Sequence, residues 1–489
     1  MTAIAFDNSY ARLPDRFYVR QPAEASPDPR LIKLNEPLAE ELGLDVKWLK
    51  SPDGVAMLAG NAFPDGAAPL AQAYAGHQFG NWVPQLGDGR ALMIGEVIGR
   101  NGKRYDIQLK GSGRTPFSRM GDGRAALGPA IREYIMSEAM HALGVPTTRA
   151  LAVLTTGEQV MREGPQPGGI VVRVAASHIR VGTFQYFYAR EDADALRLLV
   201  DHSLERHYPD RIGQGAKGLF EAVIDSQAKL IAHWLQIGFI HGVMNTDNMT
   251  VSGETIDYGP CAFLDNYDPG KVFSSIDQFG RYAYGNQPKI GHWNLGNFAQ
   301  SLLPLFDDDE EKGVAIARDA LETYADIFGS AYEAGLRAKI GLADQQNGDM
   351  ALAQDLLKVM AEQRADFTRT FRALSSLKNA EDGADAAFRS EFGDPGSVEM
   401  WLLAWRQRLA KDGSDEDTRQ SAMKRVNPMI IARNHRVEEA IAAAYAGDFA
   451  VFEKLTQALE APFADRAPDD PYALAPLPDE VVQATFCGT

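Results

Sequence analysis

The chain has 489 residues, of which 45% are hydrophobic and 24% are charged, and its formal net charge at pH 7 is -17. This length allows a large buried core and predicts roughly two to four structural units. The negative charge argues against general binding to nucleic acid or to anionic membranes, because both attract positively charged proteins. We therefore expect no nucleic-acid partner and no membrane partner, and any phosphate site must be basic locally.

The sequence offers no targeting or membrane-spanning pattern. No apolar run reaches the length of about eighteen residues that a transmembrane helix needs, and the start, MTAIAFDNSYARL, lacks the features of a signal or transit peptide. We therefore expect a cytoplasmic protein. The only cysteines, Cys261 and Cys487, are too few and too far apart in sequence to predict a disulfide framework or a zinc cluster, so structurally inert thiols are the simplest interpretation.

The first 80 residues are rich in Pro, Ala and Gly and contain one helical stretch, LNEPLAEELGL. We interpret residues 1–80 as an irregular N-terminal extension that packs on the next unit. From Gln85 onward, LGDGRALMIGEVI and RYDIQLK are typical of short strands around an Asn101-Gly102 turn, which predicts a hairpin. A small sheet is therefore expected to begin here.

Helices and further strands follow this hairpin. Residues 128–144 place Ile131 and Ile135 on one helical face, and RALAVLTTG and GIVVRVA are typical of strands. A second long helix, at residues 218–237, leads directly into FIHGVMNTDN. We therefore expect residues 81–300 to form a mixed α+β core.

The remaining chain is expected to be mostly helical. Residues 301–463 contain apolar stripes at helical spacing, which are far more typical of packed cores than of cofactor sites, and predict a helical C-terminal region. Residues 464–489 are rich in Pro and Asp and predict an extended tail that includes Cys487.

The stretch HGVMNTDN resembles a phosphotransfer catalytic loop in which Gly242 stands at the arginine position and the aspartate is missing. Protein kinases use the pattern HRDLxxxN, in which the aspartate accepts a proton from the substrate hydroxyl and the asparagine binds magnesium. His241 and Asn248 keep this spacing, but Val243 stands at the aspartate position. The nearest free carboxylate is that of Asp247, which is either a displaced general base or an ordinary turn cap.

A second acidic residue follows this loop. The stretches MTV and TI flank the turn 252–254, and a tight hairpin there would fold Asp257 back beside Asn248. An amide oxygen and a carboxylate oxygen at one point suit a hard divalent cation, so Asp257-Tyr258-Gly259 takes the place of the kinase DFG. Both residue types are also common in turns, so an ordinary loop is the alternative.

The phosphate-binding half lies earlier in the chain. Gly87 and Gly89, followed by Arg90, form a turn that backbone amides could present to phosphates, although two glycines alone indicate only a turn. Lys110 ends the strand RYDIQLK as the kinase lysine ends VAIK. Such a lysine needs a glutamate from the next helix; Glu133 and Glu138 both qualify, and Glu133 is preferred because it lies closer in sequence.

Two arginines in apolar surroundings complete the pattern. Arg173, in GIVVRVA, and Arg180, in SHIRVG, need anionic partners or a route to solvent. They could clamp phosphates, with structural ion pairing as the alternative. Asp122 and Gly123, in RMGDGRAA, predict another turn that could face a nucleotide.

These residues together resemble a known family. The stretches AGHQFGNWVPQLGDGRA, RMGDGRAALGPAIREY, EAMHALGVPTTRAL, HGVMNTDNM and DYGPCAFLD are similar to the selenoprotein O family of kinase-like proteins. The resemblance runs from about residue 74 to 297 and continues more loosely through RVNPMIIARNH. It implies an α+β, protein-kinase-like two-lobed fold, with residues 81–300 as the nucleotide-binding and catalytic core.

The resemblance also implies an activity. Family members bind ATP in a reversed orientation relative to protein kinases and transfer AMP, rather than phosphate, to hydroxyl side chains of proteins; UMP transfer is also attributed to bacterial members. By motif, Asp247 would accept the proton, Asn248 and Asp257 would hold Mg²⁺ or Mn²⁺, and Glu133 would orient Lys110. The residues that would contact the nucleotide are Gly87, Gly89, Arg90, Lys110, Asp122, Gly123, Arg173, Arg180 and, through the metal, Asp257.

Other functions stay open from the residues alone. A kinase that transfers the γ-phosphoryl group with Asp247 as base is one, and a non-catalytic nucleotide-binding scaffold is another. Some family members carry selenocysteine near the C-terminus, where this chain has Cys487, so a redox-sensitive contact between Cys487 and Cys261 is a further hypothesis.

Overall fold

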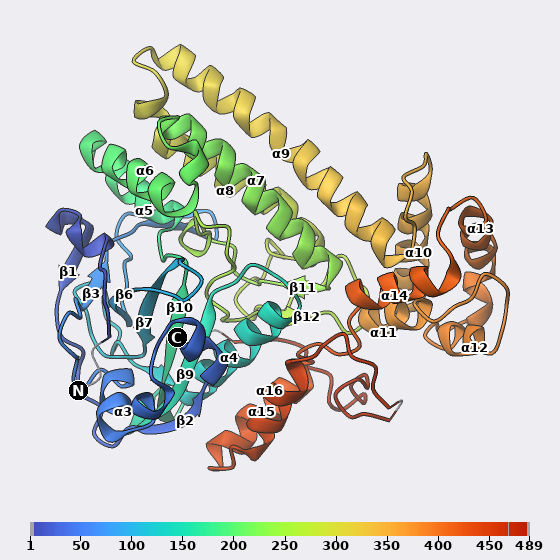
Figure 1. The fold of residues 1–489 in the computed structure, drawn as a ribbon, viewed down its shortest axis with the longest axis horizontal. Coiled ribbons are helices and arrows are strands. Elements are labelled where there is room, and N and C mark those ends of the chain that lie inside the picture. The colour runs from blue at the N-terminus through green and yellow to red at the C-terminus, as the bar shows by residue number, and fades with distance from the viewer. Residues whose placement is uncertain (1–3, 468, 487–489) are drawn as a thin grey trace.

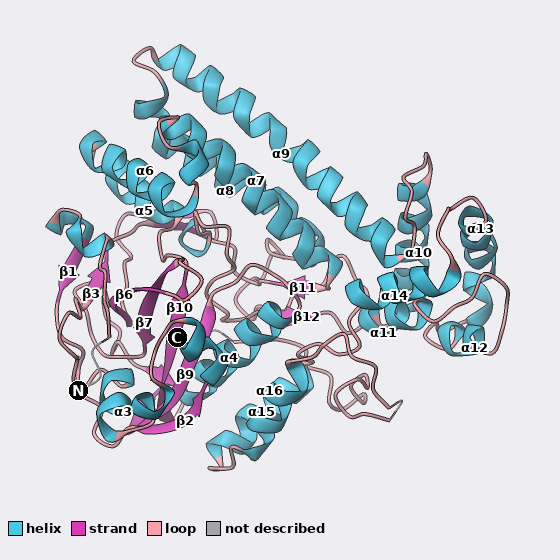
Figure 2. Ribbon diagram, in the orientation of Figure 1, coloured by secondary structure: helices cyan, strands magenta, loops and turns pink. Residues whose placement is uncertain are grey.

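The computed structural model describes residues 4–467 and 469–486. The fold is mixed α+β: an antiparallel sheet lies in the N-terminal half, and the C-terminal half is mostly helical (Figures 1 and 2). The strands are β1 (Tyr18–Arg20), β2 (Arg30–Leu34), β3 (Leu70–Gln72), β4 (Gly76–Gln78), β5 (Asn81–Val83), β6 (Ala91–Ile98), β7 (Arg104–Lys110), β8 (Ala125–Ala126), β9 (Arg149–Met161), β10 (Pro165–Ala175), β11 (Phe239–Ile240) and β12 (Ala262–Phe263).

Eight of these strands form one sheet, in the order β1-β3-β6-β7-β10-β9-β2, with β8 paired to β10. The predicted hairpin at Asn101-Gly102 is confirmed as β6 and β7, and Gly102 supplies the positive φ of 75° that the turn requires. In the pairing of β7 with β10, Lys110 lies opposite Val171 and Gln108 lies opposite Arg173. Because side chains alternate along strands, Lys110 and Arg173 share one face of the sheet.

The prediction that residues 1–80 are irregular is wrong, because this segment forms β1 to β4 and three short helices. The strands β1, β2 and β3 come from this segment and belong to the main sheet: β2 pairs with β9, and β3 lies between β1 and β6. Strands of three to five residues are too short to show a clear alternation of apolar and polar side chains. Their pairing partners, not their own sequence pattern, place them in the sheet.

Both long helices predicted for the core are confirmed, as α4 and α7. Helix α4 packs on β9 and β10 and buries Ile131 and Ile135, whereas α7 packs against α8 and α9, with which it runs side by side in Figure 1. The helices are α1 (Glu36–Glu41), α2 (Val46–Leu49), α3 (Pro52–Leu58), α4 (Leu127–Ala142), α5 (Val181–Tyr188), α6 (Ala193–His207), α7 (Gly215–Gln236), α8 (Gln287–Phe306), α9 (Glu310–Lys339), α10 (Asp349–Gln363), α11 (Phe367–Leu374), α12 (Ala384–Arg389), α13 (Glu399–Leu409), α14 (Glu416–Val426), α15 (Asn434–Tyr445) and α16 (Ala450–Leu459).

The apolar faces of these helices form separate cores. Helices α15 and α16 cover α4, where Phe452 packs edge-on against Tyr134 at a ring distance of 5.4 Å. A second core lies among α5, α6, α7 and α8, and a third joins α10, α11 and α13 around Trp405. The helical C-terminal half therefore contributes to the core of the N-terminal half as well as forming its own.

The tail returns to the middle of the molecule. The Thr485 hydroxyl donates to the main-chain oxygen of Pro260 at 2.6 Å, and its backbone N–H donates to Phe273 at 2.7 Å. Cys487 lies outside the described residues, whereas Cys261 is buried beside Pro260. Within the part of the chain that the structure describes, no helix is long and apolar enough to cross a membrane.

Candidate active site

Three cationic side chains converge on the carboxylate of Asp257. Its Oδ1 accepts hydrogen bonds from Lys110 Nζ at 3.1 Å and from Arg173 Nη2 at 2.6 Å, and its Oδ2 accepts one from Arg180 Nη1 at 3.0 Å. Asp257 itself has a φ of 63°, a left-handed conformation that few non-glycine residues adopt and that is frequent at functional sites. The structure thus brings together four of the predicted site residues.

Glu133 joins the same cluster from α4. Its Oε2 lies 2.6 Å from Lys110 Nζ, and its Oε1 lies 2.7 Å from Arg173 Nε. The other candidate, Glu138, instead binds Arg149 on the far side of the helix turn. Lys110 is therefore held between two carboxylates, those of Glu133 and Asp257.

Burial and charge act in opposite directions on these two acids. Burial alone would raise the pKa of Asp257, but the charges of Arg173, Lys110 and Arg180 outweigh it and hold that pKa well below its usual value. Burial would likewise raise the pKa of Glu133, and Arg173 and Lys110 lower it overall. Both carboxylates are consequently ionised at neutral pH, and the cluster contains two negative and three positive side chains.

The loop from His241 to Asn248 is held in place by the side chains of its two end residues. The buried His241 ring contacts the main-chain oxygen of Ile256 through Nε2 at 2.8 Å, which ties the loop to the residue before Asp257. Asn248, at the end of the 3-10 helix η4 (Thr246–Asn248), donates from its amide nitrogen to the main-chain oxygen of Val243 at 2.9 Å. Val243, at the kinase aspartate position, therefore contributes its backbone and leaves the Asn248 oxygen for a ligand.

Asp247 is a buried carboxylate that accepts few hydrogen bonds. Its side chain accepts one hydrogen bond, of 3.3 Å from Gln78 Nε2, and its Oδ1 is buried with no hydrogen-bond partner among the described residues. Burial raises the pKa of Asp247 to about 6, against the opposing charge of Arg180. The main-chain oxygen of Asp247 accepts a hydrogen bond of 2.9 Å from the same Arg180 nitrogen that binds Asp257. Asp247 therefore lies beside the cationic cluster and is poised to accept a proton near neutral pH.

The segment between the two loops is not the predicted hairpin. Its turn is present, with Glu254 N–H donating to the Thr250 hydroxyl at 3.0 Å, but the flanks do not pair with each other. Thr250 instead forms a bridge with Arg180, and Thr255 forms one with Thr147. Pairing with distant segments satisfies these backbone groups and still delivers Asp257 to the site.

The glycine turn lies at the start of β6. Gly87 has a φ of 83°, and a Cβ at Gly87 would lie 2.3 Å from the Phe117 ring, so both conformation and space require glycine there. The main-chain oxygen of Arg90 accepts from Gly111 N–H at 2.7 Å, which fixes the turn beside the residue after Lys110. Between the glycines, Asp88 is buried, and its Oδ2 accepts from the backbone of Gln72.

Asp122 and Gly123 form a turn that packs on the segment after β7. A Cβ at Gly123 would lie 2.2 Å from the backbone of Gly113, which requires glycine at this close approach. The Asp122 carboxylate pairs with Arg162 at 2.8 Å and does not join the Lys110–Asp257 cluster. The turn therefore packs on the segment after β7 without a direct contact to the cluster.

Several contacts at the site involve residues that sequence reasoning did not single out. The Arg180 guanidinium lies 4.6 Å from the centre of the Tyr74 ring, a cation–π contact. Gln78 binds Asp247, and Asn245 accepts from Phe79 N–H at 3.0 Å. Tyr74, Gln78 and Phe79 lie within or beside AGHQFGNW, a stretch without periodic pattern, so only its resemblance to the family could have drawn attention to it.

Asp257 and Asn248 offer oxygens of the kind that a divalent metal bound to phosphate takes. Asp257 Oδ1 accepts hydrogen bonds from two cations, whereas Oδ2 accepts only one and can accept a further bond. The Asn248 side chain donates through its nitrogen, so its amide oxygen can also bind a metal. Hard oxygen ligands of this kind suit Mg²⁺, which takes few protein ligands and fills its other positions with phosphate oxygens and water. In the described residues no group of three or more His, Cys, Asp or Glu side chains could hold a metal, so an all-protein metal site is not offered.

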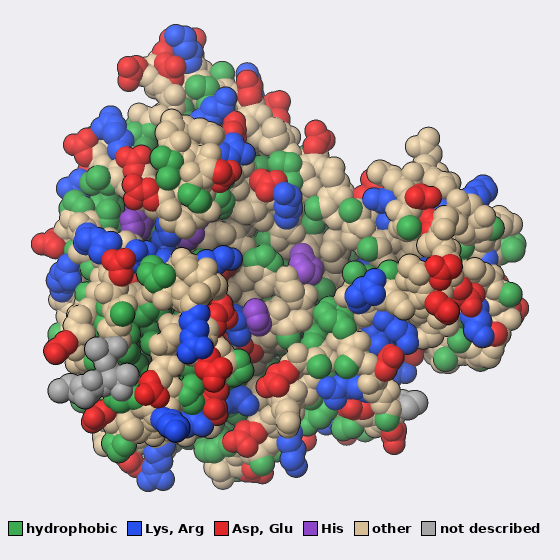
Figure 3. Space-filling view, viewed as in Figure 1, with side chains coloured by type: hydrophobic (Ala, Val, Ile, Leu, Met, Phe, Trp, Pro, Cys, Tyr) green, Lys and Arg blue, Asp and Glu red, His purple; other side chains and the backbone are tan. Residues whose placement is uncertain are grey.

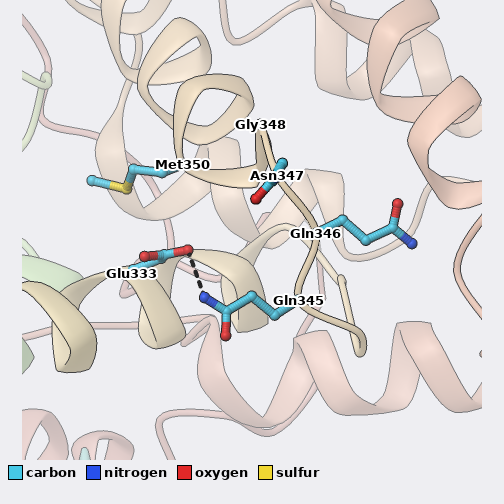
Figure 4. A pocket seen from close by; sticks show the side chains of 6 residues that line it. All are labelled: Glu333, Gln345, Gln346, Asn347, Gly348 and Met350. Atoms are coloured by element: carbon cyan, nitrogen blue, oxygen red, sulfur yellow. Dashed lines mark hydrogen bonds between the residues drawn. The ribbon is translucent and has the colours of Figure 1, made fainter.

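Other surface features do not compete with this site. The pocket in Figure 4, of about 490 Å³, lies between α9 and α10, where Gln345 donates to Glu333 at 3.2 Å, and none of the predicted site residues line it. On the face in Figure 3, acidic and basic side chains are interspersed.

Comparison with known proteins places the chain in a family. Residues 1–460 match the family model described as protein adenylyltransferase SelO. Proteins named protein nucleotidyltransferase YdiU are similar over the whole length: that of Bradyrhizobium diazoefficiens is 56% identical over 487 residues, covering 99% of each chain. That of Rhizobium etli is 58% identical over 490 residues, covering 100% of this chain and 98% of the relative. The chain belongs to the protein adenylyltransferase SelO family.

Proposed function

We propose that the chain transfers AMP from ATP, or UMP from UTP, to Ser, Thr or Tyr hydroxyls of proteins and releases pyrophosphate. Membership of the SelO family supports nucleotidyl transfer, and the names of the relatives agree with it. The observation that carries the proposal is the junction at Arg180, where one nitrogen contacts both the main chain of Asp247 and the carboxylate of Asp257. A proton acceptor and a phosphate-binding cluster are thereby adjacent.

Different side chains carry out the different steps of the reaction. The acceptor hydroxyl attacks the α-phosphorus, its oxygen forms the new bond, and the bond from that phosphorus to the bridging oxygen of pyrophosphate breaks. Asp247 takes the hydroxyl proton. Lys110, Arg173 and Arg180 stabilise the negative charge that gathers on the β- and γ-oxygens as pyrophosphate leaves.

The remaining assignments complete the site. Asn248 and Asp257 would hold Mg²⁺ or Mn²⁺, which when bound neutralises phosphate oxygens. Glu133 positions Lys110 and Arg173. Asp257 and Glu133 already hold the cationic side chains in position before the nucleotide binds. The nucleotide phosphates therefore bind to positive groups that are fixed in advance. The nucleotide itself would be enclosed by Gly87, Gly89, Arg90, Asp122 and Gly123.

We also propose that the sheet and the segment through α8 form a kinase-like, two-lobed core, with units bounded at about residues 80, 300 and 463. The order of the elements supports this: a glycine turn, the strand with Lys110, the helix with Glu133, the catalytic loop and Asp257 follow one another along the chain. The hydrogen bond between Lys110 and Glu133 agrees with it.

Labelled ATP tests the proposal. The chain is incubated with Mg²⁺ or Mn²⁺ and ATP labelled at either the α- or the γ-phosphorus, and protein-bound label is measured. Retention of the α-label together with release of labelled pyrophosphate from γ-labelled ATP is expected. Retention of the γ-label would indicate a kinase, and retention of neither by the chain or by a proteome extract would contradict transferase activity.

A further inference from the structure

A groove of about 530 Å³ opens beside the loop that carries Asp247. One wall is formed by the β4–β5 turn, with Phe79 and Asn81, and the other by the loop and helix start that contain Ile276, Phe279, Arg281 and Lys289. None of the nucleotide-site candidates lines it. The groove is thus a separate surface next to the candidate active site.

Both walls are bonded to the loop that carries Asp247. Asn245, two residues before Asp247, accepts hydrogen bonds through Oδ1 from Phe79 N–H at 3.0 Å and from the Tyr282 hydroxyl at 2.7 Å. Gln78, next to Phe79, donates to Asp247 itself. A polypeptide in the groove would therefore pass directly by the proposed proton acceptor.

The groove exposes large apolar side chains. Phe279 is 97% exposed and Ile276 is 55% exposed. Exposed apolar groups that line a concave surface are typical of sites that bind a protein partner. Apolar side chains of the partner would cover them.

The same surface carries positive charge without a matching acid. The Arg281 guanidinium lies 4.6 Å from the centre of the Trp293 ring, and its Nε and Nη2 are buried with no hydrogen-bond partner among the residues that the structure describes. No ion pair joins Arg281 or Lys289 to a carboxylate within the described part of the chain. Asp277 also lines the groove, but its two oxygens accept from the backbone N–H groups of Arg281 and Tyr282. In a chain with a net charge of -17, this groove attracts acidic partners locally.

We propose that the groove binds the acceptor protein as an extended segment, with an acidic residue against Arg281 and Lys289 and an apolar residue against Phe279. This inference rests on the proposed nucleotidyl transfer and adds the class of acceptor that the site prefers. In the bound segment, the residue whose hydroxyl is modified is next to the acidic and the apolar residue, and its hydroxyl lies beside Asp247.

Synthetic peptides test this preference. One peptide carries a Ser, a Thr and a Tyr flanked by Glu and Leu, and its counterpart has Lys in place of each Glu; transfer of α-label from ATP to each is measured. We expect the acidic peptide to have a KM lower by at least about fivefold, as for complementary charges at a partly exposed interface. Arg281→Gln combined with Lys289→Gln should abolish this difference and leave the KM for ATP unchanged.

Matched variants separate the groove from general surface effects. Phe279→Ser should raise the KM for the acidic peptide, whereas Met400→Ser, at a residue 77% exposed on α13, should not. Lys358→Gln on α10 is the control for Lys289→Gln. Equal transfer to both peptides, or a changed KM for ATP in the double variant, would overturn the groove proposal. So would labelling of the chain itself without labelling of either peptide, whereas no α-label transfer to any protein contradicts the proposed function instead.

Discussion

Arg180 and Asp257 are joined by a hydrogen bond of 3.0 Å, and the same arginine nitrogen lies 2.9 Å from the main-chain oxygen of Asp247. The guanidinium also stacks on Tyr74. One planar cation thus spans the two acidic loops and an aromatic ring. A lysine at this position has a single ammonium group and cannot reproduce this set of contacts.

Arg180→Lys should therefore impair transfer although the charge is retained. We expect kcat/KM for ATP to fall by about tenfold or more, since roughly 1.5–3 kcal/mol is associated with a hydrogen bond to a charged group. Steady-state kinetics with α-labelled ATP measures this. Arg197→Lys, at an exposed arginine on α6 that pairs with Asp194, is the control and should leave kcat/KM unchanged. Unchanged kinetics in Arg180→Lys would mean that charge alone suffices.

Glu133 and Glu138 provide a matched pair of substitutions on α4. Glu133→Gln removes the charge that holds Lys110 and Arg173, so we expect kcat/KM to fall by at least about tenfold. Glu138→Gln weakens the contact to Arg149, outside the cluster, and should leave transfer nearly intact. Nucleotide-dependent label transfer, normalised to folded protein by circular dichroism, distinguishes the two. Equal losses in both variants would contradict the assignment of Glu133.

Asp247→Asn should remove the proton acceptor without disturbing nucleotide binding. We expect kcat to fall about 10²- to 10⁴-fold and the Kd for ATP to change by less than about twofold. Because only the ionised carboxylate accepts a proton, the pKa of about 6 predicts that wild-type kcat rises as pH increases through 6 and then levels off. A pH profile between 5 and 8 should show this rise in the wild type only. A fully active variant would exclude Asp247 as the base.

The same substitution should stabilise the fold at neutral pH. The folded-state pKa of Asp247, about 6, exceeds the value of about 3.9 expected in the unfolded chain, so the folded state binds the proton more tightly. Folding stability contributed by this group is present at low pH and is lost as pH rises toward 6, which leaves a penalty of about 1–3 kcal/mol above it. Asp247→Asn should therefore raise the thermal midpoint at pH 8 and have little effect at pH 4. A lower midpoint at pH 8 would contradict this.

Gly76 tests how closely the position of Asp247 is controlled. A Cβ at Gly76 would lie 2.7 Å from Asp247 Oδ1, so Gly76→Ala should displace the carboxylate. A small misplacement of a reacting group can reduce the rate by up to about a hundredfold, and we expect a loss of kcat with an unchanged Kd for ATP. Gly164→Ala is the control, since no atom lies within 4 Å of its added Cβ and neither glycine has a positive φ. Equal kcat values for both variants would argue against a tightly fixed Asp247.

The sequence predicts the parts of the fold in which the pattern is local. Helix α4 follows from the apolar spacing of Ile131 and Ile135, and the β6–β7 hairpin follows from Asn101-Gly102 between two β-rich runs. The strands β1 to β3 were missed because each is too short to show a period. Their place in the sheet depends on partners elsewhere in the chain.

The candidate site likewise contains residues that the sequence predicts and residues that it does not. The spacing within HGVMNTDN and DYG singled out Asp247, Asn248 and Asp257, because each belongs to a short motif that can be recognised from neighbouring residues alone. Gln78, which binds Asp247 from 169 residues away, left no such signal. The flanks of the turn before Asp257 could not be assigned either, since Thr250 and Thr255 pair with Arg180 and Thr147 and not with each other.

The bond from Thr485 to Pro260 has a consequence for the synthesis of the protein. Residues 225 positions apart meet there, directly after the loop that carries Asp257, and Thr485 is also paired with Ser274. These contacts cannot form on the ribosome until the final residues have emerged from its exit tunnel. A nascent or C-terminally shortened chain therefore lacks the brace on this loop, and the loop acquires it only when translation is complete.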